Sequence, residues 1–186
     1  MKVFQIGFNK CATLSLHSFF QKNGFNSVHW DGGKWNDVFH QNHIRGNLLC
    51  EGHDDIVFWS DLTYIQRHFE TFAHQYPDSK FIYNVRPIAD WIRSRNSHYS
   101  KNALNKYFIK KLNLDKHKID VKQYWKSEWI IYETRVLEFF KGVHQDRLLI
   151  FNIMKDGGEE IQKFLPEMKF KDLTFPHKHK RHTIRK

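Results

Sequence analysis

The sequence has little cysteine and no long apolar run. No apolar stretch approaches the roughly 20 residues that a membrane-spanning helix needs, and no charged-then-apolar leader precedes Val3. We therefore expect neither a membrane anchor nor a signal peptide. The only two cysteines, Cys11 and Cys50, stand far apart in the chain, which favours reduced thiols and a cytoplasmic location.

Aromatic residues and positive charge are what the sequence has in excess. Its 186 residues include 17 Phe and 6 Trp, which is too much apolar material for a disordered chain. This length suits one α/β domain and is too short for two, so we predict a single domain over residues 1–186. The formal net charge of +10 favours anionic partners such as a nucleotide, a polyanion or nucleic acid.

Short apolar segments alternate with segments of helical periodicity along most of the chain. Strands are expected at residues 3–7, 27–30, 80–85 and 147–151, with a brief extended piece at 47–50. Helices are expected near residues 14–20, 35–44, 62–73, 88–95, 125–140 and 161–165. This alternation predicts a three-layer α/β/α fold with a mostly parallel central sheet.

Two basic segments fall outside this alternation. Residues 100–122 are polar, basic and weakly periodic, and we expect them to form a mobile insertion with some helix. Residues 177–186 concentrate much of the positive charge and are expected to form a solvated basic tail. The 13 histidines and two cysteines match no zinc-module spacing, so no metal site is expected.

The first expected strand leads into a loop with the features of a phosphate site. The segment from Gly7 to Ser15, GFNKCATLS, precedes a helix, where unpaired backbone N–H groups and the positive end of the helix dipole favour an anion. Lys10 adds a cation, and Thr13 and Ser15 add hydroxyl groups. The common nucleotide-triphosphate loop has Gly-Lys before Ser or Thr, which is a different order. An ordinary strand-to-helix turn capped by Thr13 is the alternative.

The lysine-first order resembles the 5′-phosphosulfate loop of the sulfotransferases, which transfer a sulfonate group from 3′-phosphoadenosine-5′-phosphosulfate (PAPS) and release the bisphosphate PAP. The resemblance implies a P-loop-like fold and a Lys10 that neutralises the bridging oxygen as the sulfonate leaves. It also implies that the 5′-phosphate is bound by the loop residues Asn9, Lys10, Cys11, Ala12, Thr13, Leu14 and Ser15. Ala12 stands where the family usually has Gly, so it suits this place only if its φ is not positive. Leu14 replaces a common hydroxyl residue.

The same resemblance extends to a second phosphate site. In the sulfotransferases an Arg at the end of a middle strand and a Ser eight residues later bind the 3′-phosphate of PAPS. Arg86 directly follows the expected strand 80–85, and Ser94 comes eight residues after it. A guanidinium can bind a phosphate through two parallel hydrogen bonds, and a serine adds another. Residues 100–122 are not covered by the resemblance and are expected to lie on the acceptor side.

Sulfonate transfer is an in-line displacement that needs a general base near the acceptor. His29 and Asp31, after the second expected strand, are equal candidates, followed by Asp61, which has helix capping as its alternative role. The resemblance implies a small-molecule or carbohydrate acceptor with a hydroxyl or amine group. It gives no reason to expect nucleic acid as a partner, and the oligomeric state cannot be read from the sequence.

Two other classes of protein fit parts of the sequence. A small-molecule or nucleotide kinase on a P-loop fold is disfavoured by the missing Gly-Lys-Ser/Thr order and by the lack of an acidic strand end for Mg²⁺. A non-catalytic protein that binds polyanions or RNA would use the net charge and exposed aromatics, and would not depend on Lys10 in particular.

Overall fold

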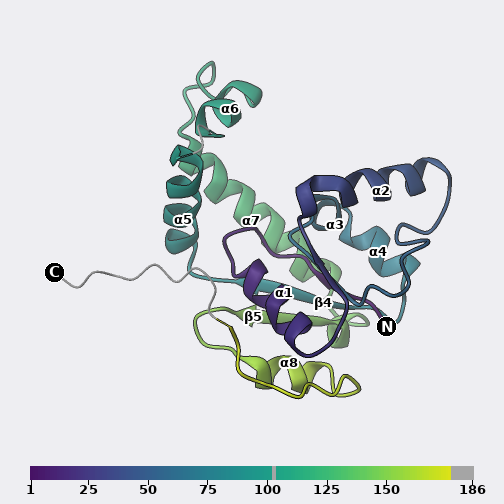
Figure 1. The fold of residues 1–186 in the computed structure, drawn as a ribbon. Helices are drawn as coiled ribbons and strands as arrows, with labels where there is room; N and C mark the ends of the chain where they lie inside the picture. Colours follow the sequence, from purple (N-terminus) through teal and green to yellow (C-terminus); the bar gives the residue numbers. More distant parts are fainter. Residues whose placement is uncertain (102–103, 177–186) are drawn as a thin grey trace. The chain divides into compact units, whose positions relative to one another are not determined.

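In the computed structural model, which describes residues 1–101 and 104–176, the chain divides into two units (Figure 1). The first unit comprises residues 1–85 and the chain from residue 147 onward, and the second comprises residues 86–146. Among the described residues, no helix is at once long and apolar enough to cross a membrane.

The first unit is built around one parallel sheet. Its elements are β1 (Val3–Gln5), α1 (Thr13–Lys22), β2 (Ser27–His29), the 3-10 turn η1 (Asp31–Gly33), α2 (Lys34–Ile44), β3 (Phe58–Ser60), α3 (Thr63–Arg67), α4 (Phe69–Gln75), β4 (Lys80–Val85), β5 (Leu148–Asn152) and α8 (Gly158–Phe164). The strands lie in the order β2-β3-β1-β4-β5, and all four pairings are parallel. The expected α/β fold with a parallel central sheet is confirmed.

Helices cover both faces of this sheet because neighbouring strand residues point to opposite sides. In β3, the ring of Phe58 stacks on that of Phe20 of α1, with centroids 3.9 Å apart, in the core that α8 also joins. The next residue, Trp59, faces the other way, and its ring lies 5.4 Å from that of Phe39 of α2. Phe39 in turn contacts Phe72 of α4 at 5.2 Å. The three layers expected from the sequence are therefore present.

The prediction of an extended piece at residues 47–50 is wrong. Leu49 and Cys50 form a turn, because side chains rather than a neighbouring strand accept their backbone N–H groups. The acceptors are Gln75 Oε1, at 2.9 Å from Leu49 N, and the Tyr76 hydroxyl, at 2.6 Å from Cys50 N. The strand that completes the sheet is instead β3, which the sequence pattern did not reveal.

The helix expected over residues 62–73 is two short helices. The backbone of His68 has φ −123°, which is outside the helical range, so α3 ends and α4 begins there. The helix α3 follows Leu62 without a side-chain cap. Asp61 therefore does not take the capping role that was its alternative.

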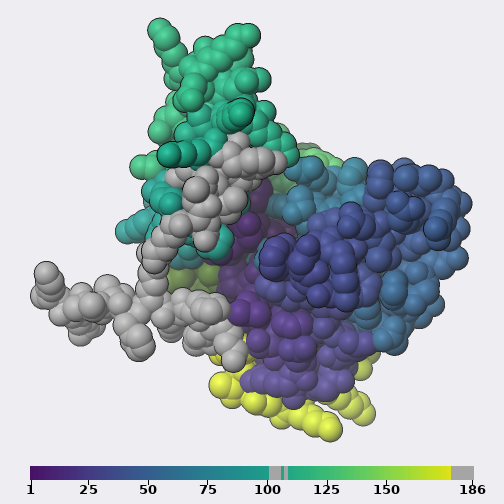
Figure 2. All heavy atoms as spheres, turned by 45° about the horizontal axis from the view of Figure 1, so that its top comes forward, coloured from purple at the N-terminus to yellow at the C-terminus, as the bar shows by residue number. Residues whose placement is uncertain are grey.

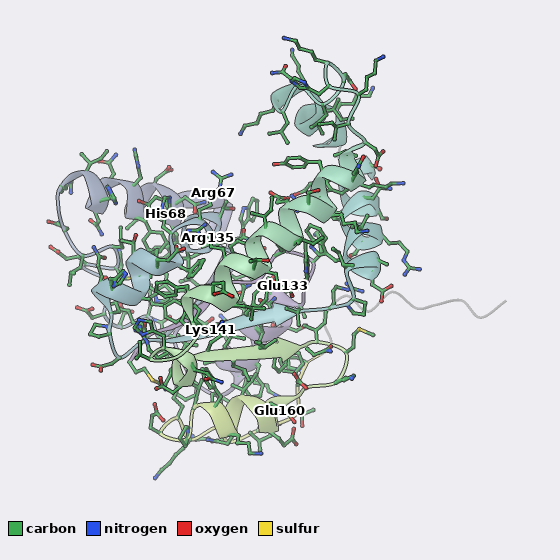
Figure 3. All side chains as sticks on the ribbon, turned by 180° about the vertical axis from the view of Figure 1, so that it is seen from behind. Arg67, His68, Glu133, Arg135, Lys141 and Glu160 are labelled. Carbon is green, nitrogen blue, oxygen red and sulfur yellow. The ribbon has the colours of Figure 1, made fainter. Side chains whose placement is uncertain are left out.

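The end of the described chain returns to the first helix. The Lys22 ammonium of α1 lies 2.9 Å from the Asp172 carboxylate, and Phe175 joins the core beneath α1. Figure 2 shows the last described segment, in yellow, below the purple N-terminal segment. The helix α8 begins where Glu160 accepts the Gly157 N–H at 2.8 Å (Figure 3), a bond that lowers the pKa of the Glu160 carboxyl.

The second unit contains α5 (Ile88–Lys101), α6 (Leu104–Lys111) and α7 (Val121–Phe139), and the 3-10 turn η2 (Gln145–Arg147) leads from it into β5. Its centre is Arg95, which is 6% exposed. The guanidinium carbon lies 4.9 to 5.2 Å from the ring centroids of Trp91, Tyr99 and Trp125, and Nη1 lies 3.1 Å from the Glu128 carboxylate. Cation–π contacts and an ion pair thus join α5 to α7.

The structure bears differently on the predictions for the two basic segments, residues 100–122 and 177–186. Within residues 100–122, the helix α6 supplies the expected helical part, and Asp120 caps α7 by accepting the backbone N–H of Lys122 at 2.9 Å. The acceptor-side role of this segment stays a prediction. The basic tail expected over residues 177–186 lies outside the described residues.

Candidate active site

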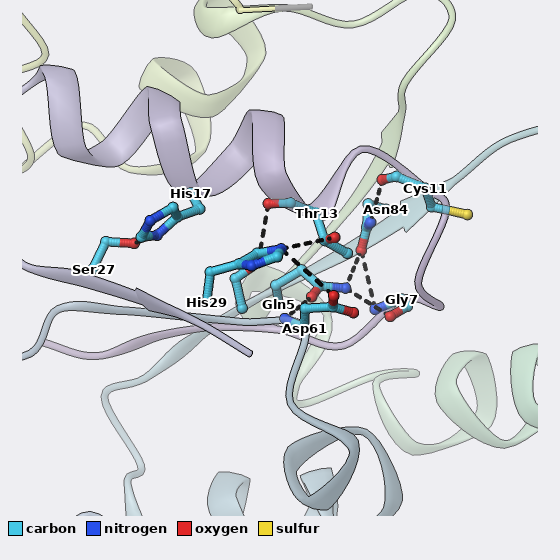
Figure 4. A network of polar contacts seen from close by, with 10 residues as sticks. Gln5, Gly7, Cys11, Thr13, His17, Ser27, His29, Asp61 and Asn84 are labelled. Atoms are coloured by element: carbon cyan, nitrogen blue, oxygen red, sulfur yellow. Dashed lines mark hydrogen bonds and ion pairs between the residues drawn. The ribbon is translucent and has the colours of Figure 1, made fainter. Parts of the chain in front are cut away.

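The carboxyl ends of parallel strands meet at one edge of the sheet, and β1 is the strand at which the strand order reverses. From β1 the chain first forms β2 and β3 on one side and then β4 and β5 on the other. Open α/β sheets bind ligands where the strand order reverses in this way. The loop after β1, which carries Lys10, lies at this point (Figure 4).

The loop backbone has the alternating shape of an anion-binding nest. Lys10 has φ 66° and Ala12 has φ 61°, whereas Cys11 between them does not have a positive φ. Such alternation turns successive backbone N–H groups toward one side. Ala12 is also the residue before α1, and neither it nor Thr13 caps the helix with a side chain. The positive end of this 10-residue helix therefore lies at the loop, where its dipole favours an anion.

Ala12 does not meet the condition set from the sequence, because its φ is positive. The left-handed conformation costs an alanine roughly 1–2 kcal/mol, while glycine gives the unfolded chain about 0.4–1 kcal/mol of extra entropy. We expect Ala12→Gly to raise the free energy of unfolding by up to about 1.5 kcal/mol in urea denaturation. The control, Ala89→Gly in the first turn of α5, is expected to lower it by at most about 0.5 kcal/mol, because the full cost of glycine applies to the middle of a helix. Equal losses in both variants would contradict the left-handed geometry.

Lys10 is a half-buried cation of this loop. Partial burial lowers the pKa of its ammonium group, and the nearby Asp61 carboxylate opposes that shift. Lys10 and Asp61 therefore interact electrostatically, although the loop and the end of β3 are far apart in the sequence. The charge of Lys10 is partly balanced by that carboxylate.

His29 lies at the end of β2 and faces the loop. Its Nε2 atom is 3.2 Å from Thr13 Oγ1 and 3.5 Å from Asp61 Oδ2. Burial lowers the pKa of the His29 imidazole, and the positive charge of Lys10 lowers it further, while a backbone hydrogen bond acts in the opposite direction. At neutral pH the imidazole is therefore neutral and able to accept a proton. Asp61 reaches it from directly after β3, with φ 57°.

Asp31 lies elsewhere. Its carboxylate forms an ion pair with Lys34 three residues later, and both side chains are largely exposed. The turn that carries it, η1, has no buried residue. The structure thus brings Lys10, Thr13, His29 and Asp61 together and places Asp31 against Lys34.

The remaining predicted residues are distributed as follows. In the loop, Asn9 is half-buried and Cys11 is fully buried. In α1, Leu14 is half-buried, while Ser15 is 2% exposed. Arg86 and Ser94 belong to the second unit, where both are half-buried. Arg86 directly follows β4, and Ser94 lies on the second turn of α5.

Two buried amides of the site were missed by sequence reasoning. Gln5 of β1 and Asn84 of β4 are 2% and 0% exposed, and their side chains meet at 2.5 Å (Figure 4). The available signal was a single polar residue inside each of two apolar strands. A third missed residue, His17, bonds Ser27 Oγ through Nδ1 at 2.7 Å, and burial lowers its pKa to about 4. Within the described part of the chain, no group of three or more His, Cys, Asp or Glu could hold a metal ion.

The strand order and the lysine-bearing loop before α1 define a P-loop-like α/β protein. The chain belongs to the sulfotransferase domain family, whose pattern it matches over residues 2–184. Its fold is similar to that of a sulfotransferase from Alicyclobacillus acidocaldarius, with a TM-score of 0.62 and 13% sequence identity over 93% of this chain and 83% of that chain. No curated protein sequence matches the chain.

Proposed function

We propose that the protein transfers a sulfonate group from PAPS to a hydroxyl or amine group of a small-molecule or carbohydrate acceptor. The proposal rests on one observation: a neutral histidine lies beside the lysine-bearing loop. His29 Nε2 is 3.2 Å from Thr13 Oγ1. Membership of the sulfotransferase domain family supports the same reaction class. A loop for an anionic leaving group and an adjacent base are what an in-line transfer requires.

The residues of the loop fit the phosphosulfate end of PAPS. The backbone N–H groups from Asn9 to Ser15 and the Thr13 hydroxyl would bind the 5′-phosphate. The Lys10 ammonium would neutralise the bridging oxygen, where negative charge grows as the sulfonate leaves. Arg86 and Ser94 are proposed to bind the 3′-phosphate, because they match the Arg and Ser with which the sulfotransferases bind it.

The reaction moves one group and one proton. The acceptor oxygen or nitrogen bonds to sulfur, the bond between sulfur and the bridging oxygen breaks, and PAP leaves with the electron pair of that bond. We assign the acceptor's proton to His29 Nε2, with Asp61 stabilising the imidazolium that forms. Recruitment of the Thr13 hydroxyl by the 5′-phosphate would release His29 Nε2 from its present neighbour. Asp31 is not assigned a role, because it pairs with Lys34.

Calorimetric titration tests this function directly. We expect the protein to bind PAP tightly and ATP–Mg²⁺ weakly, and to transfer labelled sulfonate from PAPS in a screen of carbohydrate, small-alcohol and amine acceptors. Tight binding of ATP–Mg²⁺ without binding of PAP would overturn the proposal in favour of a kinase. Binding of heparin alone, unaffected by Lys10→Met, would instead favour a polyanion-binding protein.

A further inference from the structure

The carboxyl ends of three strands are joined by one pair of buried amides. Gln5 closes β1, Asn84 lies one residue before the end of β4, and Asp61 directly follows β3. Both amides are almost completely buried, at 2% and 0% exposure. Buried polar side chains at such a depth need all their hydrogen-bonding groups satisfied, so the partners of these two decide what the pair does.

Asn84 fastens both ends of the anion-binding loop to β4. Its Oδ1 atom accepts the backbone N–H of Gly7 at 3.1 Å, where the loop begins. Its Nδ2 group donates to the backbone carbonyl of Cys11, between the two left-handed residues of the loop. A Cβ atom on Gly7 would lie 2.3 Å from Asn84 Oδ1, so only glycine allows this approach.

Gln5 connects the same loop to Asp61. Its Nε2 group donates to the Gly7 carbonyl at 2.7 Å and to Asn84 Oδ1 at 2.5 Å. Its Oε1 atom accepts the backbone N–H of Asp61 at 2.8 Å. That bond holds the left-handed backbone of Asp61, whose carboxylate points at His29. The position of the proposed base partner thus depends on the same side chain as the start of the loop.

The chemistry of the pair requires an amide at both positions. Asn84 must accept on one side and donate on the other, and Gln5 must donate twice and accept once. A carboxylate at either place would oppose a backbone carbonyl with negative charge, and an apolar side chain would leave buried backbone groups unpaired. Neither change alters Lys10, His29 or Asp61 themselves.

We infer that Gln5 and Asn84 are positioning residues for sulfonate transfer, which hold the anion-binding loop and the Asp61 carboxylate in a fixed relation. The inference rests on the proposed function. It links two roles of the site, because in the proposed function the loop binds the leaving group and Asp61 supports the base. A displacement of about 1 Å at a reacting group can lower a rate about 10²-fold, so loss of either amide should affect binding and chemistry together.

The test uses Gln5→Glu and Asn84→Asp, which keep the size of each side chain. We expect each to weaken PAP binding at least tenfold in calorimetry and to lower kcat for sulfonate transfer about 10²-fold. The matched control is Gln21→Glu on the exposed side of α1, which should leave both unchanged. A wild-type protein that transfers sulfonate, with variants that are less stable yet keep wild-type kcat and PAP affinity, would overturn the inference and leave the function standing. A wild-type protein that transfers none overturns both.

A second measurement does not depend on whether the variants fold. Amide hydrogen exchange on the wild-type protein should show the N–H groups of Gly7 and Asp61 exchanging at similar rates, because one amide pair holds both. PAP should slow both exchanges together. Protection of Gly7 by PAP with no change at Asp61 would contradict the proposed coupling.

Discussion

Lys10→Met is expected to lower the rate of sulfonate transfer by about 10²–10³-fold and to weaken binding of the intact donor PAPS no more than about tenfold. The reason is that negative charge on the bridging oxygen grows only as its bond to sulfur breaks, so the ammonium group stabilises the transition state more than the bound nucleotide. Methionine preserves most of the length of lysine without its charge. Single-turnover transfer of labelled sulfonate reports the rate, and calorimetry with PAPS in the absence of an acceptor reports the binding.

The control for this variant is Lys34→Met. Lys34 is also basic, but its side chain is 61% exposed and pairs with Asp31. It should keep wild-type transfer, which would show that the effect belongs to the position of Lys10 and not to the net charge. If Lys10→Met lost binding and rate to the same degree, Lys10 would hold the nucleotide without acting on the leaving group.

The pH dependence gives an independent check of the same residue. Burial lowers the pKa of Lys10, so the free enzyme should lose the ammonium charge at a pH below the usual lysine value of about 10.4. We therefore expect kcat/KM to fall at alkaline pH, since the active form is the protonated one. In Lys10→Arg this alkaline decrease should disappear, because a guanidinium does not titrate in that range.

The fold was largely predictable because its main signals are local. Apolar segments of the right length and helices with regular apolar spacing marked β1, β2, β4 and β5 and their helices. The strand β3 was missed although it is as long as β1 and β2, with three residues each, so its length alone does not explain the omission. The break at His68 was also hidden, because apolar residues of helical spacing continue across it.

The sequence allowed us to predict which residues belong to the site, but not which of them contact one another. Thr13, His29 and Asp61 were each candidates, but their meeting depends on the parallel register that places His29 beside Ser60, and no local pattern encodes that register. Gln5 and Asn84 were overlooked because a lone polar residue in a strand usually faces solvent. Their burial follows only from the neighbours that both faces of the sheet acquire on folding.

The second large effect is expected at the proposed base. His29→Gln should lower kcat/KM by about 10²–10⁴-fold, the usual contribution of general acid–base catalysis. Glutamine can still bond Thr13 but cannot accept a proton at these pH values. Asp61→Asn should cost less, on the order of tenfold, because the imidazole itself remains. Asp31→Asn should leave the rate unchanged, since that carboxylate pairs with Lys34 on an exposed turn.

The pH dependence of kcat/KM distinguishes His29 from Asp31 as the general base. The pKa of His29 is lowered by burial and by Lys10, so its neutral form persists below the ordinary histidine value of about 6.5. Wild-type kcat/KM should therefore be at its plateau at pH 7 and fall only as the pH drops below about 6.5. That acid decrease should be absent in His29→Gln, whose residual activity has no imidazole to protonate. If Asp31→Asn abolished transfer while His29→Gln kept both the rate and the acid decrease, the base would be Asp31, and η1 would have to bring it to the acceptor when substrate binds.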